Sequence, residues 1–208
     1  MTGGSRAAKK EQTRQALLDT TIDLVDDRSF GSLSLREVAR GAGIVPTAFY
    51  RHFASMEDLG VTLVEDSMRV LRRALREGRR DLANSGLPIA RESLTILLRQ
   101  VRAEEAKFQF LVREQHGGVA EVRRAINTEL RLFSRELAID LARIPQLAAW
   151  EADDLEVAAD LIVSIMMTAV ADLLDGDGRP ATEEALVRRA EKQLVMAILG
   201  MGQWRTVQ

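Results

Sequence analysis

Residues 34–53 read Ser-Leu-Arg-Glu-Val-Ala-Arg-Gly-Ala-Gly-Ile-Val-Pro-Thr-Ala-Phe-Tyr-Arg-His-Phe, and this stretch decides the fold. Ser34, followed three residues later by Glu37, is the capping-box pattern that starts a helix. Gly43 allows a tight turn that a side chain would obstruct. Pro46 suits the first turn of the next helix, where its missing N–H has no intrahelical partner. Two short helices joined by a glycine turn predict a helix-turn-helix, whose second helix enters the major groove of DNA.

The second helix of this motif is predicted to run from Pro46 to His52. Phe49 and Phe53 are four residues apart and should face the core, so the side chains between them should face outward. A tyrosine, an arginine and a histidine exposed together suit contacts to phosphates and base edges. The residues expected to face outward are Thr47, Ala48, Tyr50, Arg51 and His52.

The composition predicts an all-α fold. Of the 208 residues, 46% are hydrophobic and 29% are charged, which favours a packed core over global disorder. Proline is scarce, and strong helix formers abound. The absence of cysteine excludes disulfides and cysteine-based zinc sites. No apolar run reaches the length of a membrane span, and no signal-peptide core follows the basic start, so we expect a cytoplasmic protein with no membrane partner.

The charge distribution fits a DNA-binding unit at the N-terminus. The net charge is −2, but residues 1–55 carry 8 basic and 6 acidic residues. The first part of the chain is therefore positive by two charges and the remainder is negative by four. This sign is the one expected for a unit that binds a polyanion.

Helical patterns continue through the rest of the chain. Residues 1–8 are expected to be disordered, and the first helix should run from Lys9 to about Asp27. A cap at Ser55 opens a longer fourth helix that should reach about Leu82. Further helices are expected near 89–103, 105–115, 118–142, 153–174 and 182–204. We therefore expect an N-terminal helix-turn-helix domain over 1–54 and a C-terminal helical domain over 55–208.

Arginines spaced by three and four share one face of the fourth helix. The simpler interpretation is a solvated face paired with nearby carboxylates, and the alternative is a docking strip for an anionic ligand or partner. The carboxylates expected to pair are Glu65, Asp66, Glu77 and Asp81. The arginines are Arg69, Arg72, Arg73, Arg76, Arg79 and Arg80.

The segment from Val157 to Leu174 is apolar except for one polar stripe. A helix so apolar around its circumference is buried on several sides. The last helix has a matching apolar stripe, so two such helices from each of two subunits should form a four-helix dimer bundle. The alternative is a bundle within one chain. The polar stripe is Asp160, Ser164, Thr168 and Asp172. The expected interface residues are Ile165, Ala169, Leu194 and Ile198.

Over about residues 12–64 the chain resembles the TetR family of bacterial repressors. The resemblance is carried by the run from Arg36 to Phe53 together with Leu59: its spacing, its turn glycine and its Tyr-Arg-His-Phe ending agree with the family. A closer similarity is to the FabR and DesT type of regulators, which control unsaturated-fatty-acid synthesis. The segments that carry it are 29–40, 49–53, 58–60, 110–117 and 123–126, with Phe133.

The resemblance implies a homodimer on palindromic operator DNA, with recognition helices about 34–36 Å apart. The residues it implies as phosphate contacts are Ser34, Tyr50 and His52. The residues it implies near base edges are Arg36, Thr47 and Ala48. Most relatives carry lysines near positions 54 and 56, where this chain has Ala54 and Met56. We expect Arg51, His52 or the N-terminal arm to replace that backbone contact.

The same resemblance implies a regulatory ligand rather than a cofactor. Related regulators sense long acyl chains, commonly as acyl-CoA or acyl-carrier-protein thioesters. Such a ligand should bind in the C-terminal domain, move the fourth helix and change the spacing of the two DNA-binding heads. Arg113 and Glu114 are expected to form a structural ion pair. The candidate pocket residues, each of which alone is more simply a core residue, are Phe108, Leu111, Phe133, Ile162, Met166 and Met167.

Three alternatives stay open. The same DNA-binding motif is compatible with a TetR-type regulator of efflux or other genes that senses a different small hydrophobic molecule. A helical interaction module that has lost DNA binding fits the missing lysines. An enzyme is disfavoured because no G-x-S-x-G, H-E-x-x-H or P-loop pattern occurs. Residues 175–178 begin like a calcium loop but lack its later ligands.

Overall fold

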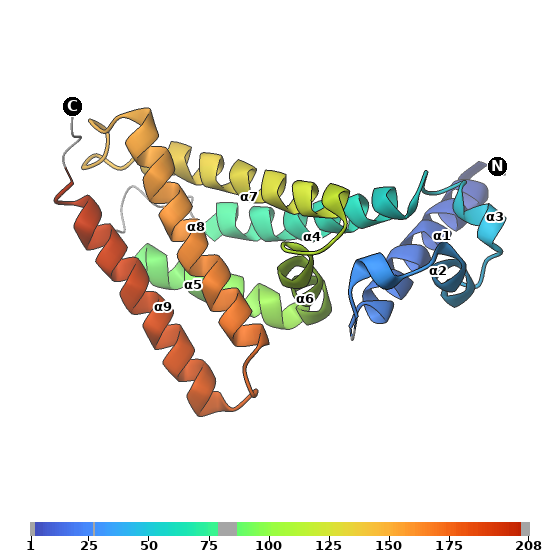
Figure 1. Cartoon of the computed structure of the whole chain (residues 1–208). Helices are drawn as coiled ribbons and strands as arrows, with labels where there is room; N and C mark the ends of the chain where they lie inside the picture. The colour runs from blue at the N-terminus through green and yellow to red at the C-terminus, as the bar shows by residue number, and fades with distance from the viewer. Residues whose placement is uncertain (1–2, 27, 79–86, 205–208) are drawn as a thin grey trace. The chain divides into compact units, whose positions relative to one another are not determined.

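The computed structural model describes residues 3–26, 28–78 and 87–204 (Figure 1). These residues form helices and turns without a strand, which confirms the predicted all-α fold. The chain divides into two compact units, one comprising residues 1–67 and 106–127 and the other residues 68–105 and 128–208. Helices α4 and α7 contribute several residues to each unit, and α6 contributes only Glu105 to the second. The predicted domain division after residue 54 stays a prediction.

The first helix, α1, spans Gly3–Leu24, so the predictions for its two ends were wrong. It begins before Lys9 because alanine, lysine and glutamate in this region are strong helix formers, and the flanking glycines do not prevent a helical start. It ends before the predicted Asp27, which lies outside the described residues. Within α1, the hydroxyl of Thr21 is buried and donates to the carbonyl of Leu17 at 2.7 Å.

The remaining helices agree with the predicted ones to within a few residues. A short 3₁₀ turn, η1, covers Phe30–Ser32. The helix-turn-helix consists of α2 (Leu35–Gly41) and α3 (Pro46–Phe49). The longer helices are α4 (Met56–Gly78), α5 (Leu87–Ala103), α6 (Glu105–Glu114), α7 (Ala120–Leu141), α8 (Ala152–Leu174) and α9 (Pro180–Met201). The predicted end of the fourth helix near Leu82 lies outside the described residues.

In the second unit, α8 packs along α9, and α5 lies against both (Figure 1). Buried Ala159, Val170 and Leu194 belong to this packing. Ion pairs mark the edge of α5 and α9, where Arg91 lies 2.6 Å from Glu191. Because such partly exposed ion pairs add little stability, the contact of α5 with α9 rests mainly on apolar burial.

Helix α8 is long and apolar enough to cross a membrane by length and composition alone. The expectation that no apolar run reaches that length was therefore wrong. The physical reason is that Asp160 and Asp172 are the only charged residues after the first turn and a half of the helix. Single helices of this kind are weak evidence for a membrane span, since a core helix has the same composition. The packing of α8 on α9 accounts for its buried apolar residues.

Two of the arginines on α4 pair with carboxylates of α7. Arg72 lies 2.9 Å from Glu129, and Arg76 lies 2.6 Å from Glu136. Pairs within one helix are weak and compete poorly with a carboxylate on a packed neighbour. The first of these pairs is largely shielded from solvent, with Arg72 22% and Glu129 12% exposed. Arg79, Arg80 and Asp81 lie outside the described residues.

Candidate DNA-binding site

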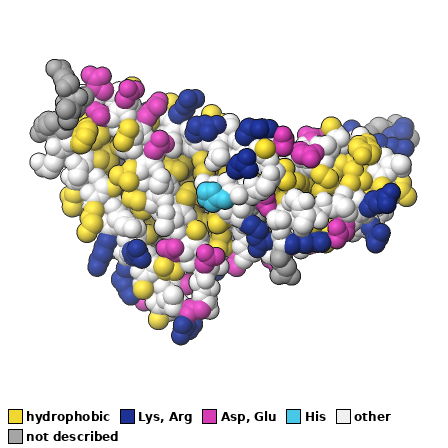
Figure 2. All heavy atoms as spheres, viewed as in Figure 1, with side chains coloured by type: hydrophobic (Ala, Val, Ile, Leu, Met, Phe, Trp, Pro, Cys, Tyr) yellow, Lys and Arg dark blue, Asp and Glu magenta, His cyan; other side chains and the backbone are white. Residues whose placement is uncertain are grey.

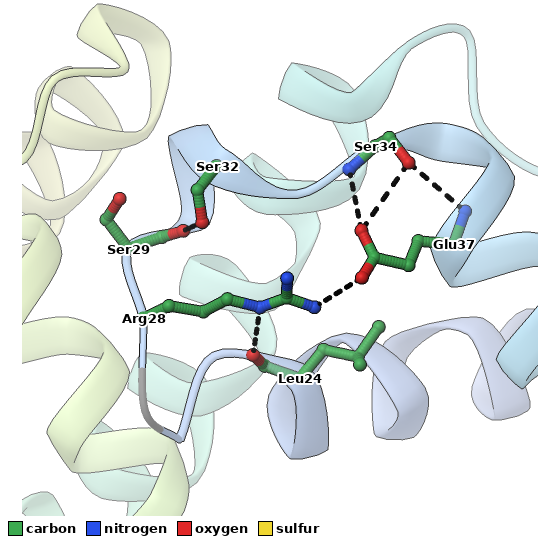
Figure 3. Close-up of polar contacts among 6 residues, drawn as sticks. All are labelled: Leu24, Arg28, Ser29, Ser32, Ser34 and Glu37. Carbon is green, nitrogen blue, oxygen red and sulfur yellow. Dashed lines mark hydrogen bonds and ion pairs between the residues drawn. The ribbon is translucent and has the colours of Figure 1, made fainter.

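The start of α2 is fixed by the predicted capping box, which the structure confirms. The backbone N–H of Glu37 donates to Ser34 Oγ at 3.3 Å, and the Glu37 carboxylate lies 3.5 Å from the backbone nitrogen of Ser34 (Figure 3). Arg28 donates to the carbonyl of Leu24 at 3.1 Å and to Glu37 Oε1 at 2.7 Å. The hydrogen bond from Arg28 is the main cause that holds the pKa of Glu37 below its ordinary value. Arg28 thus ties the end of α1 to the start of α2.

The turn between α2 and α3 has the geometry that its sequence predicts. Gly43 adopts a φ of 70°, a left-handed conformation that side chains other than glycine rarely accept. The N–H of Ile44 donates to the carbonyl of Ala39 at 2.9 Å and closes the turn. Pro46 occupies the first turn of α3. These contacts fix the direction in which α3 leaves α2.

Helix α3 is shorter than predicted, because it ends at Phe49 and not at His52. The N–H of Arg51 donates to the carbonyl of Ala48 at 3.1 Å, and that of His52 to Phe49 at 2.8 Å. These bonds span three residues, so the chain continues as tight turns where an α-helix was predicted. The side chains of Tyr50, Arg51 and His52 are therefore carried by turns and not by an α-helix.

Buried phenylalanines anchor residues 46–53, which we call the recognition segment, and leave its polar side chains at the surface. Phe49 is fully buried and Phe53 is 2% exposed, with ring centroids 5.7 Å apart. Tyr50, in contrast, is 64% exposed. Of the other residues predicted to contact DNA, those that are exposed are Ser34, Arg36, Thr47 and Arg51, and those that are half-buried are Ala48 and His52.

His52 is less open than predicted. Its Nδ1 is buried and has no hydrogen-bond partner among the described residues. Burial lowers the pKa of His52, and the positive charges of Lys10, Arg51 and Arg14 lower it further. The imidazole is therefore harder to protonate than that of an unperturbed histidine.

The end of α6 holds the loop between α1 and α2, a contact that the sequence did not predict. Glu114 is 1% exposed, and its Oε1 accepts the backbone N–H of Phe30 at 2.8 Å. The guanidinium of Arg113 donates to the carbonyls of Val25, Asp26 and Arg28, at 2.9 Å for Asp26 and 3.1 Å for Arg28. Arg113 thereby satisfies carbonyls beyond the end of α1, which lack intrahelical partners.

The ion pair predicted between Arg113 and Glu114 was therefore wrong. Adjacent residues on a helix point about 100° apart, so their side chains reach different partners. Those partners lie 84 residues or more away in the chain, and no local pattern links them. Gly117 is the one nearby signal: a Cβ there would lie 2.1 Å from Glu114 Oε2, so the chain must pass the carboxylate without a side chain.

Phe30 fills a socket within the same unit. Its side chain is 2% exposed, and its ring lies edge-on to Phe110 with centroids 6.0 Å apart. On α4, a Cβ at Gly60 would lie 2.7 Å from the Phe30 ring and 2.6 Å from a methyl group of Val122. The glycine therefore permits the close approach of Phe30 and α7 to α4.

The candidate ligand residues are divided between the two units. Phe108 and Leu111 are buried in the first. Those in the second unit are buried Phe133, Ile162 and Met166 and half-buried Met167. Their shared role in one pocket stays a prediction.

The candidate interface residues are largely covered within a single chain. Leu194 is 1% and Ala169 8% exposed, while Ile165 and Ile198 are half-buried. Hydrophobic side chains are nonetheless visible over α8 and α9 in Figure 2. The large apolar residues that these helices expose most are Val157, Leu161, Met196 and Leu199.

Comparison with known proteins agrees with this architecture. The family model described as "Bacterial regulatory proteins, tetR family" matches residues 17–60, which include the helix-turn-helix. The model described as "Tetracyclin repressor-like, C-terminal domain" matches residues 89–201, more than half of the chain. The first match thus covers the helix-turn-helix, and the second covers most of the C-terminal helices.

Solved structures with the same fold include three bacterial regulators. The fatty acid degradation regulator FadR from Bacillus halodurans has a TM-score of 0.72 at 16% identity, covering 88% of this chain and 94% of its own. A putative TetR-family regulator from Syntrophomonas wolfei has a TM-score of 0.74 at 15% identity, covering 90% and 96%. PfmR from Thermus thermophilus has a TM-score of 0.65 at 17% identity, covering 86% and 97%. With these folds and the two family matches, the chain belongs to the TetR family of bacterial transcriptional regulators.

Proposed function

We propose that this regulator is a cytoplasmic homodimer that represses transcription by binding palindromic operator DNA. The observation that carries the proposal is the recognition segment, where buried Phe49 and Phe53 anchor a surface that exposes Thr47, Tyr50 and Arg51. Such side chains can bind phosphates and base edges without rearranging the core.

Dimerisation is supported by the exposed apolar residues of α8 and α9. Val157 is 69% and Leu161 50% exposed, four residues apart on one face of α8. Met196 and Leu199 on α9 are 70% and 59% exposed. Apolar groups gathered on two packed helices suit a subunit interface better than contact with water. The proposed interface therefore extends from the half-buried Ile165 and Ile198 to these exposed neighbours.

We further propose that long-chain acyl-CoA is the regulatory ligand and that fatty-acid genes, including those for desaturation, are the targets. Support comes from the similarity of the head and of residues 110–117 to regulators of unsaturated-fatty-acid synthesis. One structure of the same fold is a fatty acid degradation regulator. The buried apolar residues Phe133, Ile162 and Met166 offer the kind of surroundings that an acyl chain requires.

A gel-shift titration tests both parts. The purified protein should retard DNA from upstream of its own gene, and oleoyl-CoA or palmitoyl-CoA should change the apparent Kd while free CoA should not. DNA binding without any acyl-CoA response would favour a regulator of efflux or other genes that senses a different hydrophobic molecule. No binding to that DNA at low salt would overturn the operator proposal and favour an interaction module.

A further inference from the structure

Three cationic residues from two parts of the head lie near the end of the recognition segment. Arg51 follows α3, and Lys10 and Arg14 belong to α1. The guanidinium carbon of Arg14 lies 5.3 Å from the centroid of the Phe53 ring. Lys10 precedes Arg14 by one helical turn, so the two side chains emerge on the same face of α1. The α1 face that carries Lys10 and Arg14 therefore borders the recognition segment.

Arg14 is held in place and still open to a partner. Phe53, beneath it, is 2% exposed and so provides a fixed surface. The Arg14 side chain is 30% exposed, and its guanidinium lies 3.7 Å from the carboxylate of Glu11, which is itself 68% exposed. A guanidinium over an aromatic face is held there by cation–π attraction, and its N–H groups can still donate to an anion. Such an arginine loses little side-chain entropy when it binds an anion.

The electrostatics of the site agree with this geometry. The charges of Lys10, Arg14 and Arg51 each lower the pKa of His52, so all three reach the same imidazole. Glu11 acts on it in the opposite sense. Three cations against one carboxylate leave a local positive field, although the whole chain carries a net charge of −2.

We infer that Lys10 and Arg14 bind the DNA phosphate backbone beside the recognition segment, together with Arg51. The inference rests on the proposed operator binding and adds residues of α1 to it. Lys10 is exposed and Arg14 partly exposed, so both can reach an anion. Ala54 and Met56, at the start of α4, have no charge to offer. The first turn of α4 carries Glu57 and Asp58 and no basic residue. The α1 face supplies the cations that this turn lacks, without base specificity.

The salt dependence of DNA affinity tests the inference. For the wild type and for Lys10→Gln/Arg14→Gln, the Kd is measured by fluorescence anisotropy between about 50 and 300 mM salt. Each lost phosphate contact reduces the slope of log Kd against log salt by about 0.9, so the double variant should lose about 1.8. The loss should be equal on DNA from upstream of the gene and on unrelated duplex, because phosphates carry no sequence information.

A matched control removes the same charge elsewhere. Arg99→Gln/Arg135→Gln changes two exposed arginines of the second unit and should keep the wild-type slope. The single variant Arg14→Lys keeps the positive charge and should therefore keep most of the wild-type slope. Circular dichroism melting confirms that each variant is folded.

The outcomes separate the two proposals. A wild-type slope for Lys10→Gln/Arg14→Gln, or an equal loss in the control, would overturn the α1 contact and leave operator binding standing. Wild-type protein that binds neither DNA at low salt would overturn operator binding and the α1 contact with it.

Discussion

The loop after α1 in the first unit and the α8–α9 pair in the second are held by different kinds of contact. In the first, directional bonds join distant parts of the chain: Arg113 caps carbonyls after α1, Glu114 accepts the N–H of Phe30, and Arg28 links α1 to α2. In the second, α8 and α9 are joined mainly through apolar side chains such as Val170 and Leu194. Directional bonds specify one geometry, whereas apolar packing accepts several.

The difference fits the two tasks that we propose for the units. Reading DNA requires α2 and α3 to keep a fixed placement, since the spacing of base pairs does not adapt to the protein. A sensing region gains from adaptable side chains, and Met166 and Met167 on α8 are of this kind. The contrast leads us to expect that single substitutions at the α6 contacts disturb the head, while exposed substitutions on α8 disturb assembly.

The largest effect on stability is expected for Phe30→Ala. Removing this buried ring empties the socket beside Phe110 and Gly60, and comparable phenylalanine truncations cost about 3–5 kcal/mol. Urea unfolding followed by circular dichroism measures the loss. Val45→Ala, at a position 65% exposed, should change the free energy of unfolding by less than about 0.5 kcal/mol. Equal effects in the two variants would contradict the role of the socket.

The next effect concerns assembly. Leu161→Glu places a charge on the exposed apolar face of α8 and should raise the dimer Kd at least about 100-fold, since an unpaired buried charge costs about 3 kcal/mol or more. Sedimentation velocity measures the change. Ile139→Glu, on α7 at 59% exposure, is the matched control and should stay dimeric. A charge at Ala169 should unfold the chain, because that residue is buried within one subunit. A dimeric Leu161→Glu would remove α8 from the interface.

Tyr50→Phe should weaken DNA binding by about 1 kcal/mol, or roughly fivefold, through loss of one hydrogen bond. The loss should be similar on operator and random duplex, because a phosphate contact carries no base information. Anisotropy titrations on both DNAs provide the measurement. An effect confined to the operator would instead assign Tyr50 to base recognition.

Thr47→Ala provides the opposite case on the same exposed surface. If Thr47 faces base edges, its replacement should change the preferred sequence and leave affinity for random duplex within about twofold. Selection from a randomised operator library followed by sequencing reveals the preference. Equal losses on specific and random DNA would contradict the base-facing role.

The smallest effect is a pH dependence from His52. In the free protein its pKa is lowered by burial and by Lys10, Arg51 and Arg14. Phosphates would offset those cations and raise the pKa in the complex, so binding would take up protons. Operator affinity should therefore increase as pH falls from 8 to 6, by less than about tenfold. His52→Gln should remove this dependence. Affinity that decreases over the same range would place His52 away from phosphate.

Local patterns in the sequence were enough to predict the helices and the helix-turn-helix. The capping box at Ser34 and Glu37 and the turn at Gly43 were recognisable because capping and turn geometry depend on neighbouring residues. The early start of α1 and the early end of α3 were missed, since helix ends depend on weak competing preferences.

Contacts between distant segments could not be predicted in the same way. The partners of Arg113 and Glu114 are 84 residues or more away, and Arg72 pairs with Glu129 on another helix. Each of these side chains had plausible partners nearby in sequence. Which partner is bound depends on tertiary packing, and the spacing of residues along the sequence carries no information about that packing. The ligand residues stay predictions for a related reason, because core and pocket use the same apolar side chains.

A footprint on DNA from upstream of the gene tests the central claim most directly, because it reports binding, pairing and spacing together. Hydroxyl-radical cleavage of both strands at low salt should show protection in two symmetric half-sites whose centres lie about one helical turn, or 10–10.5 base pairs, apart. Leu161→Glu should lose that paired pattern while remaining folded. Uniform cleavage with the wild-type protein, or protection of one unpaired half-site, would contradict a dimeric operator-binding regulator.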